Sequence, residues 1–237
     1  MARVQELFVT QIYREELQGG PASALIEELD DAAREICNQD RAGHAWAKAN
    51  DYPGYTSYAS LNDLPDRHPA FGDLVGVLDR HVKAFARVLE YELDSKLLAL
   101  DSLWINVLRA GGHHTAHIHP HSVISGTLYL AVPKGASAIR YEDPRLPMFM
   151  AAPPRKPTAK EKNKTFVAVA PQAGTLLLWE SWLRHEVPVN HALTERVSVS
   201  FNYRLDSSAG RVGRGPYSPT TWTTICRVCG RLRCSKR

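Results

Sequence analysis

Short segments with strand composition follow one another through the second half of the chain, and they constrain the fold more than any other feature. Each is rich in β-branched or aromatic residues, and Pro or Gly residues punctuate the gaps between them. The segments predicted as strands are residues 103–109, 123–132, 138–141, 165–169, 175–179 and 196–205. A chain with helices first and short strands afterwards is typical of the α+β class, in which helices buttress a β-sandwich or barrel.

The first half of the chain supplies those helices. Residues 7–13, LFVTQIY, alternate in strand fashion and predict an opening strand. Apolar residues that recur every three or four positions predict helices over residues 22–39 and 69–93. The stretch over residues 50–68 is rich in Gly, Pro, Tyr, Ser and Asn and predicts a loop. A second long connection, residues 144–164, predicts an excursion between strands, of the kind that often closes over a substrate.

Half of the ten histidines lie between His113 and His121, directly before a predicted strand. Imidazole is the commonest metal ligand in proteins, and residues two apart in an extended segment face the same side. His117 and His119 can therefore bind one ion from a single strand end. His81 lies beside the apolar stripe of the second predicted helix, and we interpret it as a structural histidine.

A second polar segment contains His185. Eleven residues later Arg196 opens a strand in which alternate polar residues, ending with Asn202, share its face. An unpaired buried guanidinium is costly, so Arg196 requires an anionic partner. Its planar fork fits a carboxylate, which favours a small carboxylate-bearing ligand. The alternative is a surface ion pair between Arg196 and Glu186 or Glu195.

The order of these motifs resembles that of the Fe(II)/2-oxoglutarate-dependent oxygenases. The residues that carry the resemblance are the HxH of His117 and His119, SGTLYL, YEDPR, GTLLLWESWLRHEV and ERVSVSFN. The similarity covers about residues 5–205, and the chain looks most like a bacterial and phage group described as 2-oxoglutarate/Fe(II) oxygenases. The resemblance implies a double-stranded β-helix, or cupin-like jelly roll, with a metal at the open end of the barrel.

The resemblance also implies roles for individual residues. His117, His119 and His185 match the positions of the metal ligands. Arg196 matches the basic residue that holds the far carboxylate of 2-oxoglutarate. The usual ligand set is two histidines and a carboxylate, whereas His119 stands here at the position of the acid. Asp143, from YEDPR, is the alternative third ligand.

Three further polar residues, Asn106, Tyr129 and Asn202, are candidates for binding 2-oxoglutarate from the predicted strands. The implied activity is that of an oxidoreductase, a dioxygenase that uses Fe(II), 2-oxoglutarate and O2. It would hydroxylate an unidentified small molecule or peptide and release succinate and CO2. One alternative is a three-histidine cupin-type dioxygenase or isomerase without 2-oxoglutarate. The other is a non-catalytic jelly-roll module that binds carbohydrate or a protein.

Charge is unevenly distributed along the chain. Seven basic residues and no acid follow residue 206, so the first 206 residues have a formal net charge of −3 although the whole chain has +4. A mildly acidic folded part gives no reason to expect a specific nucleic-acid partner. We therefore predict one oxygenase domain over residues 1–206 and a basic, disordered tail over residues 207–237, which contains three of the four cysteines.

The composition also bears on the compartment. No window approaches the ~18 apolar residues of a membrane span, and the start of the chain lacks the pattern of a signal peptide. The cysteines do not form a disulfide framework for a domain of this size. These features predict a cytoplasmic protein without a membrane partner, and they leave the oligomeric state open, with a homodimer among the options.

Overall fold

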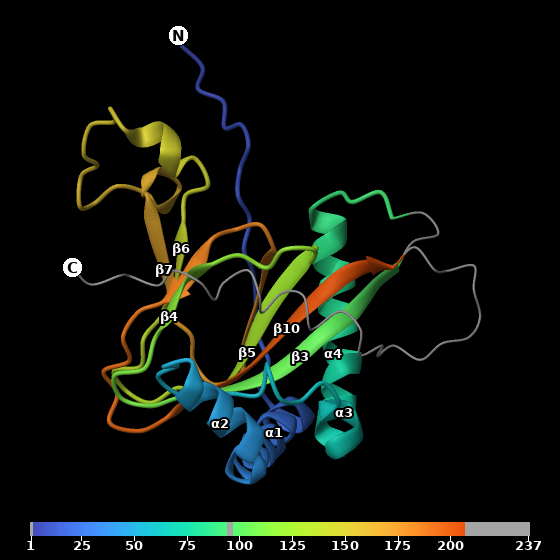
Figure 1. The fold of residues 1–237 in the computed structure, drawn as a ribbon. Helices are drawn as coiled ribbons and strands as arrows, with labels where there is room; N and C mark the ends of the chain where they lie inside the picture. Colours follow the sequence, from blue (N-terminus) through green and yellow to red (C-terminus); the bar gives the residue numbers. More distant parts are fainter. Residues whose placement is uncertain (1, 94–96, 207–237) are drawn as a thin grey trace, which may run out of the picture.

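Two antiparallel sheets face each other in the computed structural model, which describes residues 2–93 and 97–206 (Figure 1). The six-stranded sheet has the order β1 (Tyr13–Glu16), β8 (Thr175–Glu180), β5 (Ile124–Ala131), β10 (Arg196–Asp206), β3 (Leu97–Leu108) and β2 (Tyr55–Thr56). The four-stranded sheet has the order β4 (His114–His117), β9 (His185–Val187), β6 (Ile139–Glu142) and β7 (Phe166–Val169). From β3 to β10 the chain passes repeatedly between the two sheets, which confirms the predicted jelly roll.

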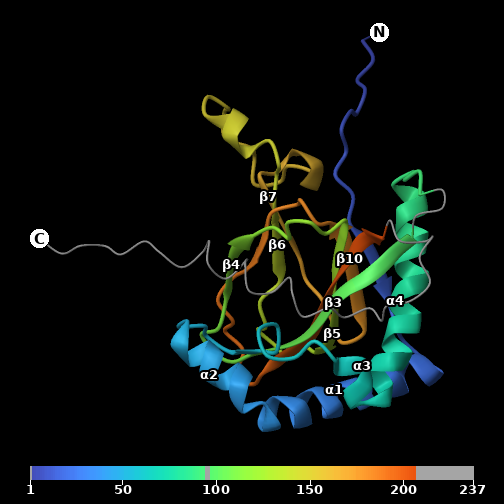
Figure 2. The same cartoon turned by 45° about the vertical axis from the view of Figure 1, so that its right-hand side comes forward.

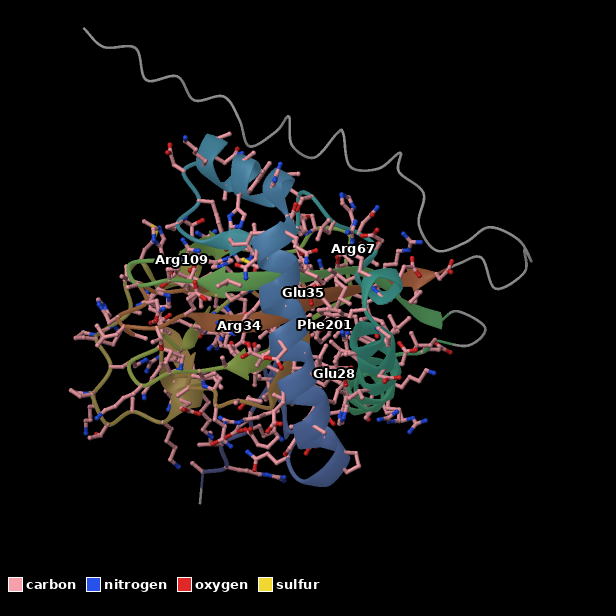
Figure 3. The ribbon with its side chains drawn as sticks, turned by 90° about the horizontal axis from the view of Figure 1, so that it is seen from below. Glu28, Arg34, Glu35, Arg67, Arg109 and Phe201 are labelled. Atoms are coloured by element: carbon pink, nitrogen blue, oxygen red, sulfur yellow. The ribbon has the colours of Figure 1, made fainter. Side chains whose placement is uncertain are left out.

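The helices lie on the outer face of the six-stranded sheet (Figure 2). They are α1 (Gly20–Gln39), α2 (Arg41–Ala49), α3 (Leu64–Arg67) and α4 (Pro69–Val88). In the view from below, α1 crosses the sheet beside Phe201 (Figure 3). Its buried side chains, including Leu29, pack in one cluster with Phe71 of α4 and with Phe201. Each large apolar side chain buried in this way contributes roughly 1.5–3 kcal/mol, so the helices are held by this face.

The side chains of strand β10 alternate between the two faces of the six-stranded sheet. Val197, Val199 and Phe201 belong to the cluster under the helices. Arg196 and Ser198, on the opposite face, line a cavity between the sheets. The side-chain alternation of a strand therefore places the predicted polar row inside the barrel. A second, smaller cluster that includes Tyr129 and Trp179 fills the rest of the space between the sheets.

Three predicted elements have other bounds than expected. The strand predicted at residues 103–109 is β3, which begins earlier, at Leu97. The opening strand was placed at residues 7–13, but β1 begins only at Tyr13, and Phe8 is 96% exposed. This prediction was wrong because the charged residues that follow Tyr13, not the apolar ones before it, pair with β8. The second helix was expected to reach residue 93, but α4 ends at Val88. Glu90 has a φ of 55°, a left-handed conformation that a right-handed helix does not accommodate.

Five short elements were not predicted. Helix α2 is preceded by its N-cap Asp40, whose carboxylate accepts a 2.9 Å hydrogen bond from the backbone N–H of Gly43. Strand β2 and helix α3 lie within residues 50–68, which were expected to be a loop. Strands β4 and β9 contain His117 and His185, two of the histidines singled out in the sequence. All are short, and the three strands depend on distant pairing partners for their existence.

The connection between β6 and β7 projects from the barrel and contains two single 3-10 turns, Leu146–Phe149 and Glu161–Asn163 (Figures 1 and 2). Nδ1 of His81 and the hydroxyl of Tyr13 form a 2.8 Å hydrogen bond, in keeping with a structural role. None of the helices within the described ranges is long and apolar enough to cross a membrane. The predicted tail, residues 207–237, lies outside the described residues.

Candidate metal centre

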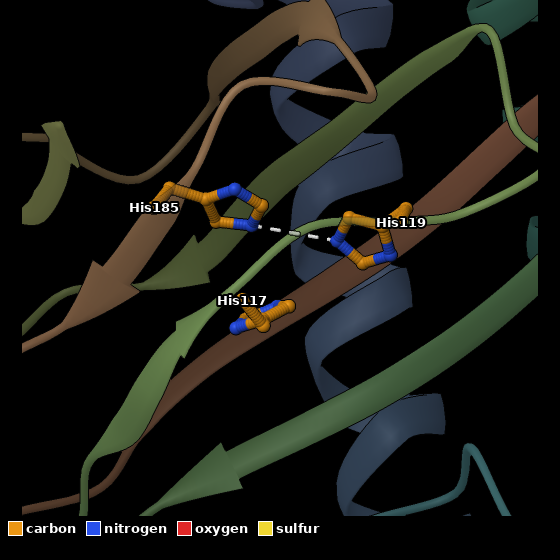
Figure 4. Close-up of side chains that lie close together, drawn as sticks. All are labelled: His117, His119 and His185. Atoms are coloured by element: carbon orange, nitrogen blue, oxygen red, sulfur yellow. Dashed lines mark hydrogen bonds between the residues drawn. The ribbon is translucent and has the colours of Figure 1, made fainter. Parts of the chain in front are cut away.

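Three histidines converge at one end of the barrel (Figure 4). His117 ends β4 and lies directly opposite His185 in the pairing with β9. His119 follows two residues later, where its backbone N–H donates a 3.0 Å hydrogen bond to the carbonyl of Ser181. One nitrogen from each of the three imidazoles lies within 4.8 Å of the others, and no other such group occurs in the part of the chain that the structure describes.

Hydrogen bonds to the backbone orient two of the three rings. Nδ1 of His117 lies 2.7 Å from the carbonyl oxygen of Thr115, and Nδ1 of His185 lies 2.9 Å from that of Leu183. A ring that donates its Nδ1–H in this way keeps a lone pair on Nε2. The Nε2 atoms of His119 and His185 are 3.4 Å apart, the contact dashed in Figure 4. Two donors at ~2.1 Å from one ion come about this close.

Burial keeps these imidazoles neutral. It lowers the pKa of His119 and of His185 to about 3, with the neighbouring imidazoles adding to the effect, and it also lowers the pKa of His117. Neutral imidazole is the form that binds a metal. The cluster therefore has its donors free at neutral pH, without a proton to displace.

A cavity extends from the histidines into the barrel. Its lining residues are Trp104, Asn106, His114, His117, His119, Gly126, Thr127, Tyr129, Ile139, Trp179, His185, Val187, Arg196, Ser198 and Ser200. Four buried atoms of this wall have no hydrogen-bond partner among the described residues: Oδ1 of Asn106, Oη of Tyr129, Nε1 of Trp179 and Nε of Arg196. Buried polar atoms without partners are rare in proteins, so this wall fits a polar ligand.

Arg196 is the only cation in this lining, and it is 3% exposed. Its guanidinium lies 4.7 Å from the ring centroid of Tyr129. The surface-pair alternative was wrong, because Glu195 binds other arginines and Glu186 pairs with Arg140. No ion pair of Arg196 occurs within the described residues, and the cavity lining contains no carboxylate. The cavity beside Arg196 therefore offers it no protein carboxylate, and an anionic ligand can take that place.

Asp143, the alternative third ligand, lies outside the histidine cluster. Its carboxylate accepts hydrogen bonds of 3.0 and 2.7 Å from the guanidinium of Arg145 and one of 2.9 Å from the backbone N–H of that residue. These bonds hold the pKa of Asp143 below its usual range. The structure thus brings His119, and not Asp143, together with the other two histidines.

The candidate 2-oxoglutarate residues divide into two groups. Asn106 and Tyr129 line the cavity, and each presents an oxygen without a partner. Burial raises the pKa of Tyr129, and the adjacent charge of Arg196 opposes that shift. Asn202 does not line the cavity, because its amide bonds to Ser102 and Ser125 at 3.1 and 2.7 Å. The prediction for Asn202 is therefore not supported by its position.

Sequence reasoning missed two neighbours of the site. His114 lines the cavity, and Tyr52, from the segment that follows α2, contacts it. His114 belongs to the histidine-rich stretch, but the stretch alone did not say which of its members face inward. No signal in the sequence points to Tyr52.

A larger hollow of about 440 Å³ lies elsewhere, between α1 and the turn at Gly174. It is lined by Glu27, Asp30 and Asp31 among others and by no histidine. The chemistry of a transition-metal site therefore belongs to the smaller cavity in the barrel.

Solved structures share the fold. A prolyl-4-hydroxylase from Pseudomonas putida is 17% identical, with a TM-score of 0.56 over 82% of this chain and 93% of that one. HygX from Streptomyces hygroscopicus, with nickel and 2-oxoglutarate bound, is 14% identical, with a TM-score of 0.55 over 82% of each chain. The epimerase SnoN from nogalamycin biosynthesis, in complex with Fe3+ and alpha ketoglutarate, is 14% identical, with a TM-score of 0.57 over 88% of this chain and 89% of that one.

Residues 102–202 match a protein family described as "Putative 2OG-Fe(II) oxygenase". The chain has no significant match among curated protein sequences. The family match contains the three clustered histidines and Arg196, and it falls on the double-stranded β-helix that the solved structures share.

The matched residues 102–202 therefore carry the sequence pattern of a family of Fe(II)/2-oxoglutarate oxygenases, and the solved structures share the fold. Fe(II) is the cofactor of such an oxygenase, and 2-oxoglutarate and O2 are its co-substrates. The family match supports neither a three-histidine enzyme without 2-oxoglutarate nor a non-catalytic jelly-roll module.

Proposed function

We propose that this oxygenase is a hydroxylase in which His117, His119 and His185 hold Fe(II) and Arg196 holds the distal carboxylate of 2-oxoglutarate. When bound, iron and 2-oxoglutarate activate O2 to oxidise the substrate, with release of succinate and CO2. One observation carries the proposal. A buried arginine without an acidic partner lines the same cavity as three convergent, neutral imidazoles.

The imidazole rings are oriented so that they can bind one metal ion together. The backbone carbonyls of Thr115 and Leu183 fix the rings of His117 and His185, so that Nε2 of each faces the common point. Three ligands from one side leave the opposite side of an ion open. His119 is proposed as the third ligand over Asp143, since the contacts of Asp143 with Arg145 keep its carboxylate occupied elsewhere.

Arg196 supplies charge and direction. A guanidinium binds a carboxylate through two parallel hydrogen bonds, and inside a barrel this contact is little screened by water. The face of Tyr129 beneath the guanidinium limits its freedom, so the arginine is held ready for the ligand. The unpaired oxygens of Asn106 and Tyr129 offer further polar contacts to the same molecule.

Aromatic side chains close the site against water. Trp179 is 2% exposed, and its ring lies edge-on to His185 at 4.7 Å between centroids. The ring of Tyr141 packs against both, with centroids 5.4 Å from Trp179 and 6.1 Å from His185. A dry wall strengthens the electrostatic contacts within it and protects reactive species from water.

Hydroxylation is proposed as the outcome, and a small molecule or a peptide as the substrate. The fold shared with a prolyl-4-hydroxylase over 93% of that chain supports this outcome. The fold shared with the epimerase SnoN makes the outcome worth testing directly. Candidate small molecules and peptides incubated with isotopically labelled O2 should yield a product that gains one labelled oxygen atom. A changed product without the label would overturn the hydroxylase assignment.

The decisive experiment is the anaerobic addition of Fe(II) and then 2-oxoglutarate to metal-free protein. We expect one iron per chain and a visible metal-to-ligand charge-transfer band that requires both additions. His185→Ala should lose most of the iron, whereas Asp143→Asn is the matched control and should keep both iron and band. Iron binding without a band would contradict the role of 2-oxoglutarate, and unchanged iron binding by His185→Ala would contradict the ligand set.

A further inference from the structure

His114 is a fourth imidazole in the wall of the cavity, and the metal does not require it. In a regular strand, residues three apart face opposite sides, which would turn His114 away from the side of His117. The register between β4 and β9 shifts between these two histidines, as at a β-bulge. A bulge adds one residue to a strand, so that both side chains return to the same side.

Tyr52 holds the ring of His114. Its hydroxyl contacts Nε2 of His114, and the two rings lie edge to face with centroids 5.2 Å apart. Burial raises the pKa of Tyr52, so the phenol keeps its proton, and we assign it as the donor to Nε2 of His114. A neutral imidazole that accepts at Nε2 has its own proton on Nδ1. In this tautomer Nδ1 of His114 carries the proton. It lies 3.5 Å from the same hydroxyl, at the limit of a hydrogen bond, so this N–H is available to a ligand.

Close backbone packing brings Tyr52 to this position. A Cβ on Gly112 would lie 2.4 Å from the carbonyl oxygen of Pro53, and a Cβ on Gly54 would lie 2.8 Å from that of Val107. Only glycine permits both approaches. The segment that follows α2 is thereby packed against the turn between β3 and β4, so Tyr52 is fixed to the barrel.

Arg196, the cation in the cavity lining, lies near both His114 and Tyr52. Burial is the main cause of the lowered pKa of His114, and the charge of Arg196 adds to it. The same charge acts on Tyr52, where it opposes the effect of burial. Neither Arg196 nor His114 has a carboxylate partner among the described residues, and the cavity lining offers none. Two donors in one wall without a carboxylate partner indicate a shared anionic ligand.

We propose that His114 donates a hydrogen bond to the carboxylate of 2-oxoglutarate that Arg196 anchors, and that Tyr52 is the positioning residue that orients His114. This inference rests on the proposed function. It extends the co-substrate pocket beyond the barrel strands to the segment after α2. Tyr52 then connects the segment that follows α2 with the 2-oxoglutarate pocket.

The test measures binding to the Fe(II)-loaded, oxygen-free protein by the charge-transfer band and by calorimetry. Two probes are compared: 2-oxoglutarate, and 2-oxopentanoate, which has the same chain length but no distal carboxylate. His114→Phe should weaken 2-oxoglutarate by about 10-fold to 100-fold, as expected for a hydrogen bond to a charged group, and leave 2-oxopentanoate unchanged. Tyr52→Phe removes only a hydroxyl and should weaken 2-oxoglutarate by roughly 3-fold to 10-fold.

Two controls make the result specific. His191→Gln alters an exposed histidine outside the cavity and should change neither affinity. His114→Gln keeps an N–H donor and should recover part of the loss seen in His114→Phe. Combining His114→Phe with Arg196→Met should cost less than the two single losses together, since both act on one carboxylate.

The outcomes separate this inference from the function on which it rests. Wild-type protein that loads iron but gives no band overturns both. A wild-type band with unchanged affinity in folded Tyr52→Phe and His114→Phe overturns the inference alone. Equal weakening of both probes would show that His114 acts at the metal end, and full additivity with Arg196→Met would show that the two residues bind different groups. Either result contradicts the proposal.

Discussion

Replacing Arg196 by Met should change 2-oxoglutarate affinity and protein stability in opposite directions. Methionine has similar length but no charge, so it removes the only cation of the cavity lining and fills most of the same space. Losing a buried, charge-assisted contact costs on the order of 2–5 kcal/mol, which is about 30-fold to 5,000-fold in affinity. Iron affinity should be nearly unchanged, because Arg196 is not in the ligand cluster.

The stability effect follows from the same burial. Arg196 is 3% exposed and has no ion pair among the described residues, so the ligand-free protein bears the desolvation cost of its charge. An apolar side chain of similar size removes that cost, and the free energy of unfolding should stay constant or rise by about 1–4 kcal/mol. If Arg196 served only to stabilise the fold, its replacement would lower the free energy of unfolding and leave 2-oxoglutarate affinity unchanged.

Anaerobic titration of the charge-transfer band gives the affinity, and urea unfolding of the metal-free protein gives the stability. Arg109→Met is the matched control, since Arg109 is 66% exposed and pairs with Glu195 at the surface. It should leave 2-oxoglutarate affinity unchanged and alter stability by less than about 1 kcal/mol. Wild-type affinity in Arg196→Met together with lowered stability would refute the reasoning.

His119→Ala should lose iron and turnover together, while Asp143→Asn should keep iron, both measured as metal bound per chain. The reverse pair of results would make Asp143 the third ligand, and His119→Asp, which restores the usual carboxylate, should retain part of the affinity. Burial favours the neutral form of Asp40, but three hydrogen bonds hold its pKa below the usual value. Asp40→Asn should therefore lower the free energy of unfolding by about 1–3 kcal/mol at pH 7. Because a depressed pKa stabilises only above the unfolded value of about 3.9, the difference from wild type should shrink as the pH falls through the folded pKa. Gly126→Ala would place a Cβ 2.4 Å from the ring of Phe201 and should lower the melting temperature, at a cost of about 1–3 kcal/mol.

The elements that could be predicted from the sequence bury one face over several turns or residues. In β10, Val197, Val199 and Phe201 alternate with polar residues, and this pattern alone fixes which face meets the helices. In α4, Phe71 and Leu78 lie on the apolar stripe that packs in the core. Such a pattern is local in the sequence, so it can be read without knowing the partner.

The elements that could not be predicted depend on distant partners. Strands β4 and β9 are four and three residues long and mostly polar, and each exists because the other lies beside it. The bulge between His114 and His117 arises from that pairing, so the sequence could not show that His114 faces the cavity. The contact of Tyr52 with His114 joins residues 62 positions apart through two glycines that only the fold brings together.

The charge balance of the site gives a physical reason for a histidine at position 119. The cavity lining contains Arg196 and no carboxylate, and the three clustered imidazoles are neutral. A site with two histidines and a carboxylate would hold the same divalent ion with one unit less positive charge. An ion held by the three imidazoles would keep its full charge at one end of the cavity, and Arg196 adds a positive charge in the cavity wall. 2-Oxoglutarate has a carboxylate at each end, so a dianion of this kind matches both charges at once. His119→Asp should therefore weaken 2-oxoglutarate even where it binds iron, a loss that Arg196 alone does not explain.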